Sequence, residues 1–395
     1  MADWQPLVTD PERRAKLVAV IREIVDAVPR PEAIHLCLDR AVTRAYLAQD
    51  DTVPDPDDDV GQSLAAAVTA FATTPATPAL YGGACAVGWT IEHLAGGDTA
   101  AQVCDTIDRR LLERLDSWSE DYDLISGLVG FGVYGIERAE AGRAVVARVV
   151  DLLVQSARSS HGGLAWHTAP ELLPEWMRVE SPAGHYNIGL AHGIAGVIGF
   201  LARCVRHDAE PRAHGLLEAA MTYLLAAAPP PSEGMRFPTW LPETRKRRRT
   251  AWCYGDLGVA TCILAAARAC ERDDWNREAL VVARACATGE DDTVRDAGLC
   301  HGTAGALHTF VRLWNATREP VFAEAANRWI DQTLAIRRVG EPPAGYPTLQ
   351  QSADGERWGP GSCILTDAPG VALALHAAIS EIEPTWDRMM LLDVS

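Results

Sequence analysis

The sequence has too few basic residues for a protein that binds nucleic acid. It also has no apolar run long enough for a protein that spans a membrane. Its 395 residues include 36 Lys and Arg against 53 Asp and Glu, which gives a net charge of −17. Proteins that bind nucleic acid need a basic face, so this charge argues against a nucleic-acid partner. No uninterrupted apolar run approaches the roughly 20 residues that span a bilayer, so we expect no transmembrane helix.

The N-terminus also lacks a targeting signal. Residues 1–6 contain no basic region followed by an apolar one, so we expect no secretory signal peptide. We therefore expect a cytoplasmic protein whose ten cysteines are reduced. Most of these cysteines fall in apolar helical stretches, where small buried core residues are expected: Cys37, Cys85, Cys104, Cys204, Cys262 and Cys270.

Part of the acidic excess is concentrated in one short segment. Between residues 50 and 59 the chain carries six aspartates: Asp50, Asp51, Asp55, Asp57, Asp58 and Asp59. Runs of like charge are usually exposed to water. We interpret this segment as a solvated loop between two helices.

Helical periodicity dominates the sequence, and the alternation typical of β-strands is almost absent. Asp10, Pro11 and Glu12 form a helix start, with a capping residue, a proline at the first position and an acidic first turn. This helix is expected to end at Pro29. Further helices are expected at about 33–48 and 60–72, so the sequence predicts an all-α fold.

A short glycine-containing motif recurs along the chain, and an apolar helical stretch follows each copy. The six anchor residues of these copies are Gly83, Gly127, Gly193, Gly255, Gly302 and Asp367. Repeats of about 40 residues or more have the size of a helical hairpin and bury their apolar faces against their neighbours. We therefore expect one domain over residues 1–395, with repeat units from about 80 to 380.

The position of the glycines favours a closed ring of helices over an open solenoid. Glycine lets backbones approach closely, as required where inner helices converge and their N-termini crowd together. The pattern predicts inner helices that all begin at one end of a ring. Three irregular segments, at 159–186, 228–250 and 337–361, are either the rim of a cleft at that end or plain surface loops.

Two cysteines and a histidine at the unit starts form a candidate zinc site. Cys253 precedes one anchor glycine, and Cys300 and His301 precede the next one. Neither segment has the C-x-x-C spacing of a zinc finger. Three protein ligands leave a fourth position open, which is the catalytic arrangement. Asp123 and His192 precede two other anchors, so the ring would bring all five side chains to the same end.

These motifs resemble those of the lanthionine synthetase C-like family, the lantibiotic cyclases. The matching segments are Asp-Leu-Ile-Ser-Gly-Leu-Val-Gly at 123–130, Gly-Leu-Ala-His-Gly-Ile-Ala-Gly at 189–196, Trp-Cys-Tyr-Gly-Asp-Leu-Gly at 252–258 and Cys-His-Gly-Thr-Ala-Gly at 300–305. The resemblance implies an α/α toroid of inner and outer helices with one zinc ion at its mouth.

The resemblance also implies a role for each candidate residue. It assigns Cys253, Cys300 and His301 to zinc, and Asp123 and His192 to acid/base chemistry. It further implicates Arg249, although four other basic residues crowd the same run, at 245–248. An arginine there could stabilise the enolate oxygen that forms during the reaction.

The resemblance implies a zinc-dependent lanthionine synthetase. Its substrate would be a dehydrated precursor peptide, in which cysteine thiols add to dehydroalanine or dehydrobutyrine to form (methyl)lanthionine thioether rings. Because the toroid would use the whole chain, dehydration is expected from a separate dehydratase. Complexes with that dehydratase and with a membrane exporter would keep the protein cytoplasmic but peripheral to the membrane.

Three alternatives remain open. A relative of the same fold could add glutathione to dehydrated residues, which is the intermolecular form of the same chemistry. A second alternative is a non-catalytic peptide-binding module with a structural zinc ion, although mere binding requires neither Asp123 nor His192. A third is a toroidal glycosidase, but such enzymes rely on paired carboxylates in the cleft, and no such pair lies at the unit starts beside the metal ligands.

Overall fold

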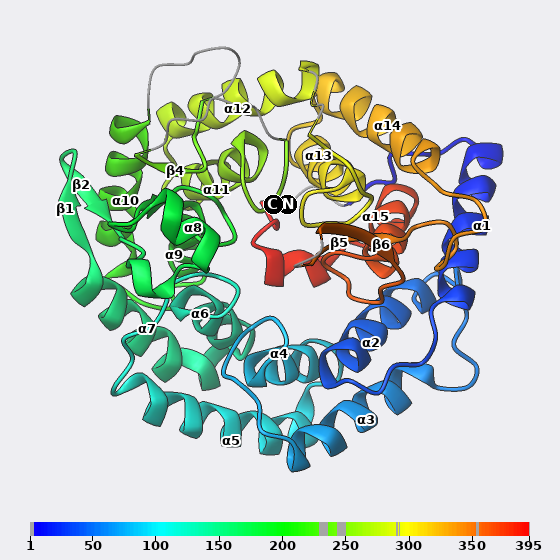
Figure 1. The fold of residues 1–395 in the computed structure, drawn as a ribbon, viewed down its shortest axis with the longest axis horizontal. Coiled ribbons are helices and arrows are strands. Elements are labelled where there is room, and N and C mark those ends of the chain that lie inside the picture. The colour runs from blue at the N-terminus through cyan, green and yellow to red at the C-terminus, as the bar shows by residue number, and fades with distance from the viewer. Residues whose placement is uncertain are drawn as a thin grey trace.

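The chain folds into an α/α toroid, in which an outer ring of helices encloses an inner one (Figure 1). The computed structural model describes residues 4–228, 236–242, 250–289, 291, 293–352 and 355–394. Within these ranges the inner ring consists of α2 (Ile34–Ala48), α4 (Ala84–Leu94), α6 (Leu128–Glu137), α9 (Ile194–Arg206), α11 (Asp256–Ala269), α13 (Thr303–Thr317) and α15 (Ala368–Ile379).

Each inner helix packs against one helix of the outer ring. The outer helices are α1 (Pro11–Ala27), α3 (Asp59–Thr73), α5 (Gly97–Leu115), α7 (Arg143–Ser156), α10 (Ala213–Ala227), α12 (Asp273–Thr288) and α14 (Pro320–Ala335). The ring closes where α15 packs between α1 and α2. An inner helix can be covered on both sides, and all twelve residues of α15 are buried.

The predicted repeat anchors are the residues that directly precede the inner helices. Five are the glycines before α4, α6, α9, α11 and α13, and the sixth is Asp367 before α15. The prediction of a ring whose inner helices begin with this motif is therefore confirmed. It missed α2, which follows Ala33 and carries no glycine motif. The division of the chain into a single domain stays a prediction.

The second glycine, present in five of the six copies of the motif, is required by the loop that precedes its own helix. A Cβ atom at Gly305 would lie 2.0 Å from the carbonyl oxygen of Leu299, and one at Gly130 would lie 2.4 Å from that of Leu124. No side chain fits at such distances. The tight turn is the main cause, because each loop folds back on the start of its own helix. A neighbouring unit adds to the crowding at Gly130, where the added Cβ would lie 2.9 Å from Leu80 Cβ.

The interpretation of residues 50–59 as a solvated loop was wrong for three of the six aspartates. Asp59 is only 4% exposed, and its carboxylate lies 2.6 Å from Arg40 and 3.3 Å from Arg44. Asp55 pairs with Arg44 at 3.2 Å, and Asp50 accepts a hydrogen bond from the C-cap of α15. The two arginines lie one turn apart on α2 and face this loop, so the charges of Asp55 and Asp59 are compensated within the protein.

Short antiparallel sheets form within the irregular segments. They pair β1 (Arg158–Ser160) with β2 (Gly163–Ala165), β3 (Tyr186–Asn187) with β4 (Trp240–Leu241), and β5 (Thr348–Ser352) with β6 (Gly355–Gly359). The remaining elements are α8 (Glu175–Glu180) and the 3₁₀ helices η1 (Ala139–Gly142), η2 (Pro170–Leu172) and η3 (Thr385–Met390). These sheets were not predicted, because strands this short have no readable alternation.

The segment that contains η3 lies inside the ring (Figure 1). Asp387 of η3 is fully buried and pairs with His308 and Arg312 of α13, at 2.7 and 2.6 Å. The indole of Trp252 and the hydroxyl of Tyr81 donate hydrogen bonds to the carbonyl groups of the same segment. Within the described ranges, no helix is both long and apolar enough to cross a membrane.

Candidate metal centre and catalytic pair

Main-chain hydrogen bonds join the loops that precede successive inner helices. The amide of Leu124 donates to Ala191, that of Ala191 to Cys253, that of Cys253 to Cys300 and that of Cys300 to Leu365, over 2.8–3.2 Å. These bonds place Cys253 directly beside Cys300, although a whole helical pair separates them in sequence. They also place His192, which follows Ala191, next to the Cys253 loop.

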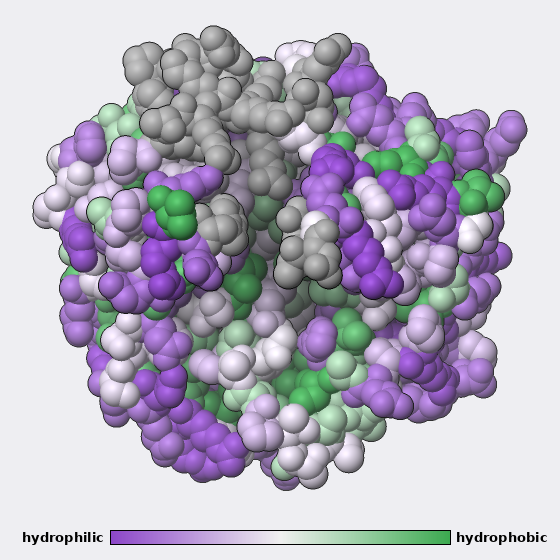
Figure 2. Space-filling model, in the orientation of Figure 1, coloured by the Kyte–Doolittle hydropathy of each residue, from purple (hydrophilic) through white to green (hydrophobic). Residues whose placement is uncertain are grey.

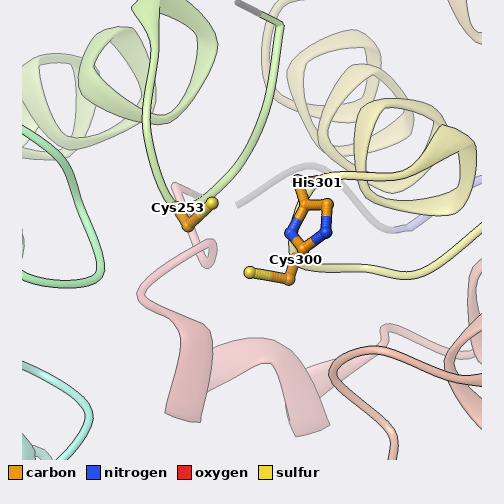
Figure 3. A group of neighbouring side chains, drawn as sticks. All are labelled: Cys253, Cys300 and His301. Carbon is orange, nitrogen blue, oxygen red and sulfur yellow. The ribbon is translucent and has the colours of Figure 1, made fainter. Parts of the chain in front are cut away.

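Cys253, Cys300 and His301 form a group that could hold a metal ion. One sulfur or nitrogen atom from each residue lies within 4.8 Å of the other two. Figure 3 shows Cys253 extending from the loop before α11, and Cys300 and His301 from the loop before α13, around a common space. Both cysteines are thiols, so both sulfurs can serve as ligands.

The donor set and its spacing fit zinc. Zn–S bonds of about 2.3 Å and Zn–N bonds of about 2.0–2.1 Å place the ligand atoms of a tetrahedral site about 3.3–3.8 Å apart. Separations within 4.8 Å require only small side-chain movements to reach these values. Two soft sulfur ligands and one imidazole favour zinc over magnesium or calcium.

A buried carboxylate supports the ring of His301. Asp296 is 5% exposed, and its carboxylate lies 3.3 Å from His301 Nε2. The other carboxylate oxygen of Asp296 accepts a hydrogen bond from the amide of Gly298. Asp296 first, and then Cys253, raise the pKa of His301 to about 9. Such a carboxylate partner is typical of metal-binding histidines, because it fixes the orientation of the ring.

Asp123 and His192 form a second pair beside this group. Asp123 is 2% exposed, and its Oδ2 lies 2.6 Å from His192 Nδ1, while its Oδ1 accepts a hydrogen bond from the amide of Ser126. The His192 side chain remains 41% exposed. Burial lowers the pKa of His192, but the hydrogen bond and charge of Asp123 outweigh it, so the net shift is upward.

Asp121 and Tyr254 complete the surroundings of His192. Burial, and then the charge of Asp123, raise the pKa of Asp121 to about 6. The Tyr254 ring stacks on that of His192, with centroids 5.8 Å apart. Its hydroxyl accepts a hydrogen bond from Asn187, and burial raises its pKa. Asp123 and Tyr254 therefore hold the imidazole between a carboxylate and an aromatic ring.

The structure therefore brings five of the six candidate residues to one end of the toroid. The sixth, Arg249, lies outside the described residues. Sequence reasoning missed the supporting residues Asp121, Asn187 and Asp296. A signal for them exists, because each precedes its anchor glycine by six positions. Arg249 has the same position relative to Gly255.

Most of the chain is similar to one family of known proteins. Residues 43–336 match the family model for lanthionine synthetase C-like protein. The nisin biosynthesis protein NisC of Lactococcus lactis subsp. lactis is 25% identical over 290 residues, which cover 65% of this chain and 68% of NisC. A solved structure of nisin cyclase superposes with a TM-score of 0.74 and 20% identity, over 97% of both chains. At this identity the superposition shows a shared fold.

Proposed function

Because the chain belongs to the lanthionine synthetase C-like family, we propose that it is a zinc-dependent lanthipeptide cyclase. Its reaction would be the addition of peptide cysteine thiols to dehydroalanine or dehydrobutyrine in a dehydrated precursor peptide. The observation that carries this proposal is the convergence of Cys253, Cys300 and His301 within 4.8 Å, beside the His192–Asp123 pair.

The metal would be held by the two sulfurs and the imidazole, with Asp296 orienting His301. A zinc ion bound there would lower the pKa of a substrate thiol from about 8.5 and so supply the nucleophilic thiolate. Side chains of the protein would carry out the remaining steps of the reaction.

His192 is the proposed proton donor. Its Nδ1 is occupied by Asp123, so Nε2 is the nitrogen left to face the cleft. The sulfur bonds to the β-carbon of the dehydrated residue, the alkene electrons move to an enolate, and Nε2 protonates the α-carbon. The proton lost by the thiol restores the imidazolium. The raised pKa of His192 suits this role, because it increases the fraction of the donor that is protonated at a given pH.

Two further parts of the proposal lie outside the described contacts. Arg249 would stabilise the enolate oxygen as a fixed cation. A separate dehydratase would supply the dehydrated precursor, and a membrane exporter would take the product.

The proposal is tested by incubating the zinc-loaded protein with a dehydrated precursor peptide. Cyclisation leaves the peptide mass unchanged, so the cysteines that remain are counted by alkylation and mass spectrometry. We expect the number of alkylatable thiols to fall. An unchanged count would contradict the proposal. A gain of glutathione mass when glutathione is added, with the peptide thiols intact, would instead support the intermolecular reaction.

The His192→Ala variant separates catalysis from mere binding. We expect it to retain one zinc ion per chain and to lose ring formation. Near-normal ring formation would remove His192 from the mechanism. A wild-type protein that binds the peptide and zinc without forming rings would favour the non-catalytic module.

A further inference from the structure

A second carboxylate beside the catalytic pair has no role in the proposed chemistry. Asp121 is half-buried, lies two residues before Asp123 and lines a cavity of about 840 Å³ together with Ser126. This cavity lies between the loop before α4 and the C-terminal half of α5. Figure 2 shows one end of the toroid hollowed at its centre, with pale and green residues exposed between purple ones of the rim. The Asp121 carboxylate is therefore within reach of water and of small groups that enter its cavity.

Equivalent residues in two other loops show where the Asp121 side chain is directed. Asp121, Asn187 and Asp296 each precede an anchor glycine by six positions. One oxygen of Asn187 and one of Asp296 accept a hydrogen bond from an amide of their own loop, over 3.0–3.1 Å. The other end of each side chain reaches a residue directly before an anchor glycine, Tyr254 at 3.1 Å and His301 at 3.3 Å. The side chain at this position therefore points toward the mouth.

Asp121 is held by its own loop in the same way, because its Oδ1 accepts a hydrogen bond from the amide of Tyr122 at 2.7 Å. After burial and Asp123, the charge of Asp121 is the next influence on the pKa of His192. Among the residues that the structure describes, no cation pairs with Asp121. A carboxylate has about four acceptor positions, so Asp121 has room for a proton.

The other titratable groups beside His192 are unsuited to take a proton from the substrate. Both oxygens of Asp123 are occupied, one by His192 at 2.6 Å and one by the amide of Ser126. Burial raises the pKa of Tyr254, so its phenol keeps its own proton. His192 is the proposed donor and must already be protonated. Asp121 is the group that remains among those described.

The groups of the same cavity on and beside α5 do not compete with Asp121. Arg110 and Arg114 line the cavity and have no acceptor for a proton. Glu120 also lines it, but it forms an ion pair with Arg114. Burial, and then the charge of Asp123, raise the pKa of Asp121 to about 6. A group with such a pKa can accept and release a proton near neutral pH.

A purely structural role does not account for the charge of Asp121. An asparagine would accept the hydrogen bond from the loop amide equally well, as Asn187 does in the loop before α9. A carboxylate at this place stands beside Asp123, and the two like charges repel each other. A charged group that is kept at a cost to stability is typical of a functional site.

We propose that Asp121 is a further catalytic residue, the base that takes the proton of the substrate thiol. This inference rests on the proposed function, because the thiol belongs to the peptide being cyclised. The S–H bond breaks, its proton moves to the carboxylate, and the sulfur electron pair forms the bond to the β-carbon. Nε2 of His192 protonates the α-carbon, and the carboxylic acid of Asp121 then returns its proton to Nε2 through water in the cavity.

The first test changes the nucleophile. It uses two dehydroalanine peptides that differ in one residue, a cysteine or a selenocysteine, whose selenol is already ionised at neutral pH. Rates are corrected for ring formation without enzyme. We expect Asp121→Asn to lower kcat roughly 100-fold with the cysteine peptide, but less than about threefold with the selenocysteine peptide. His192→Ala should lose activity with both peptides, because both enolates need a proton. An equal loss with both peptides in Asp121→Asn would overturn the assignment.

Glu120→Gln is the matched control, because it removes one charge from the neighbouring residue of the same cavity. We expect it to keep the kcat of the wild type. Asp121→Asn should keep one zinc ion per chain, and its melting temperature at pH 7 should not fall. The pKa of Asp121 is raised on folding, so its ionisation at pH 7 costs stability that asparagine restores. A variant that loses zinc or melts earlier would show a structural role instead.

A second test requires no reaction. A cysteine peptide without dehydroalanine is bound to the zinc-loaded protein at pH 7, where the free thiol is protonated. Calorimetry in two buffers with different ionisation enthalpies counts the protons released when the thiolate binds. We expect Asp121→Asn to release about one proton per peptide and the wild type to release fewer, because Asp121 takes up the proton. Equal release by the two proteins would contradict the proposal.

The outcomes separate this assignment from the proposed function. If the wild type forms rings and Asp121→Asn forms them at the same rate, Asp121 is not the base and the function stands. If the wild type forms no rings, the proposed function fails, and the proton count alone decides whether Asp121 accepts the thiol proton. If the wild type does not bind the cysteine peptide, the Asp121 assignment fails as well.

Discussion

Two opposing influences set the pKa of the His192 side chain. Burial lowers the pKa, because it disfavours the charged imidazolium. The carboxylate of Asp123 at 2.6 Å raises the pKa by more than burial lowers it. A histidine whose pKa is raised on folding binds its proton more tightly in the folded state. Its contribution to stability is therefore present at low pH and is lost as the pH rises through the folded-state pKa.

Replacing Asp123 with Asn should reverse the direction in which the pKa of His192 is shifted. With the charge removed, burial dominates and the pKa of His192 falls. If His192 acts as a proton donor, the limb of the rate profile that descends with increasing pH should shift to lower pH, with kcat reduced roughly 100-fold. The measurement is the pH dependence of ring formation, with zinc content as the control. An unshifted limb would contradict the assignment.

Cys300→Ala should abolish both zinc binding and ring formation, because it leaves the metal one sulfur and one imidazole. Zinc per chain is measured by atomic absorption after dialysis. Cys270→Ala is the matched control, since Cys270 is also a thiol but lies at the opposite end of α11 from Cys253. A Cys300→Ala protein that keeps one zinc ion per chain would show that the ligand assignment is wrong.

At the scale of the element, the loop before each inner helix is the functional unit. In the loops before α6, α9, α11 and α13, the chain folds back on its helix at the second glycine and bonds to the next loop through the main chain. These four loops carry Asp123, His192, Cys253, Cys300 and His301. Asp121, Asn187 and Asp296 take the same place in three such loops.

Gly305→Ala should damage the metal centre through the backbone. Its Cβ would lie 2.0 Å from the carbonyl oxygen of Leu299, directly before Cys300, so the loop must move. We expect a loss of about 1–3 kcal/mol in the free energy of unfolding, together with a roughly tenfold weaker zinc affinity. Urea titration and chelator competition measure the two effects.

Gly215→Ala on α10 is the control for Gly305→Ala, because no atom lies within 4 Å of its Cβ position. It should be neutral or stabilising by about 0.4–1 kcal/mol. If Gly305→Ala behaved in the same way, the loop would not depend on that contact.

Features that a short local motif encodes could be predicted from the sequence, whereas contacts between distant segments could not. The anchor glycines, the helix that begins at Pro11 and the three proposed ligands each stand in a short motif, and the inner helices were found from them. The pairing of Asp59 with Arg40 and the joining of β3 to β4 depend on segments distant in sequence. No local pattern encodes such contacts.

At the scale of the whole molecule, the segment around η3 supports the mouth from within the ring. The indole N–H of Trp252 donates to the carbonyl group of Met390 at 2.8 Å, and Cys253 is the next residue. Asp387 ties the same segment to α13 through Arg312. The loop before α11, which carries Cys253, and helix α13, which follows Cys300 and His301, are therefore linked through this axial segment.

Trp252→Phe should weaken zinc binding without replacing any ligand. It removes the donor and leaves the Met390 carbonyl group unsatisfied, which costs about 1–3 kcal/mol. We expect a lower zinc affinity as well as a lower melting temperature. Trp89→Phe on α4 is the control, because its indole is also fully buried but has no hydrogen-bond partner among the described residues. Equal zinc affinities in the two variants would contradict the role of the axial segment.

The position of η3 inside the ring constrains how the protein is made. During translation the helical pairs emerge in order, but residues 385–394 are synthesised after all of them. Until they arrive, Trp252, Tyr81, His308 and Arg312 lack their native partners. The nascent chain can therefore assemble most of its ring while its metal-binding loops remain unsupported, so full zinc affinity should be acquired only once residues 385–394 have been synthesised and have entered the ring.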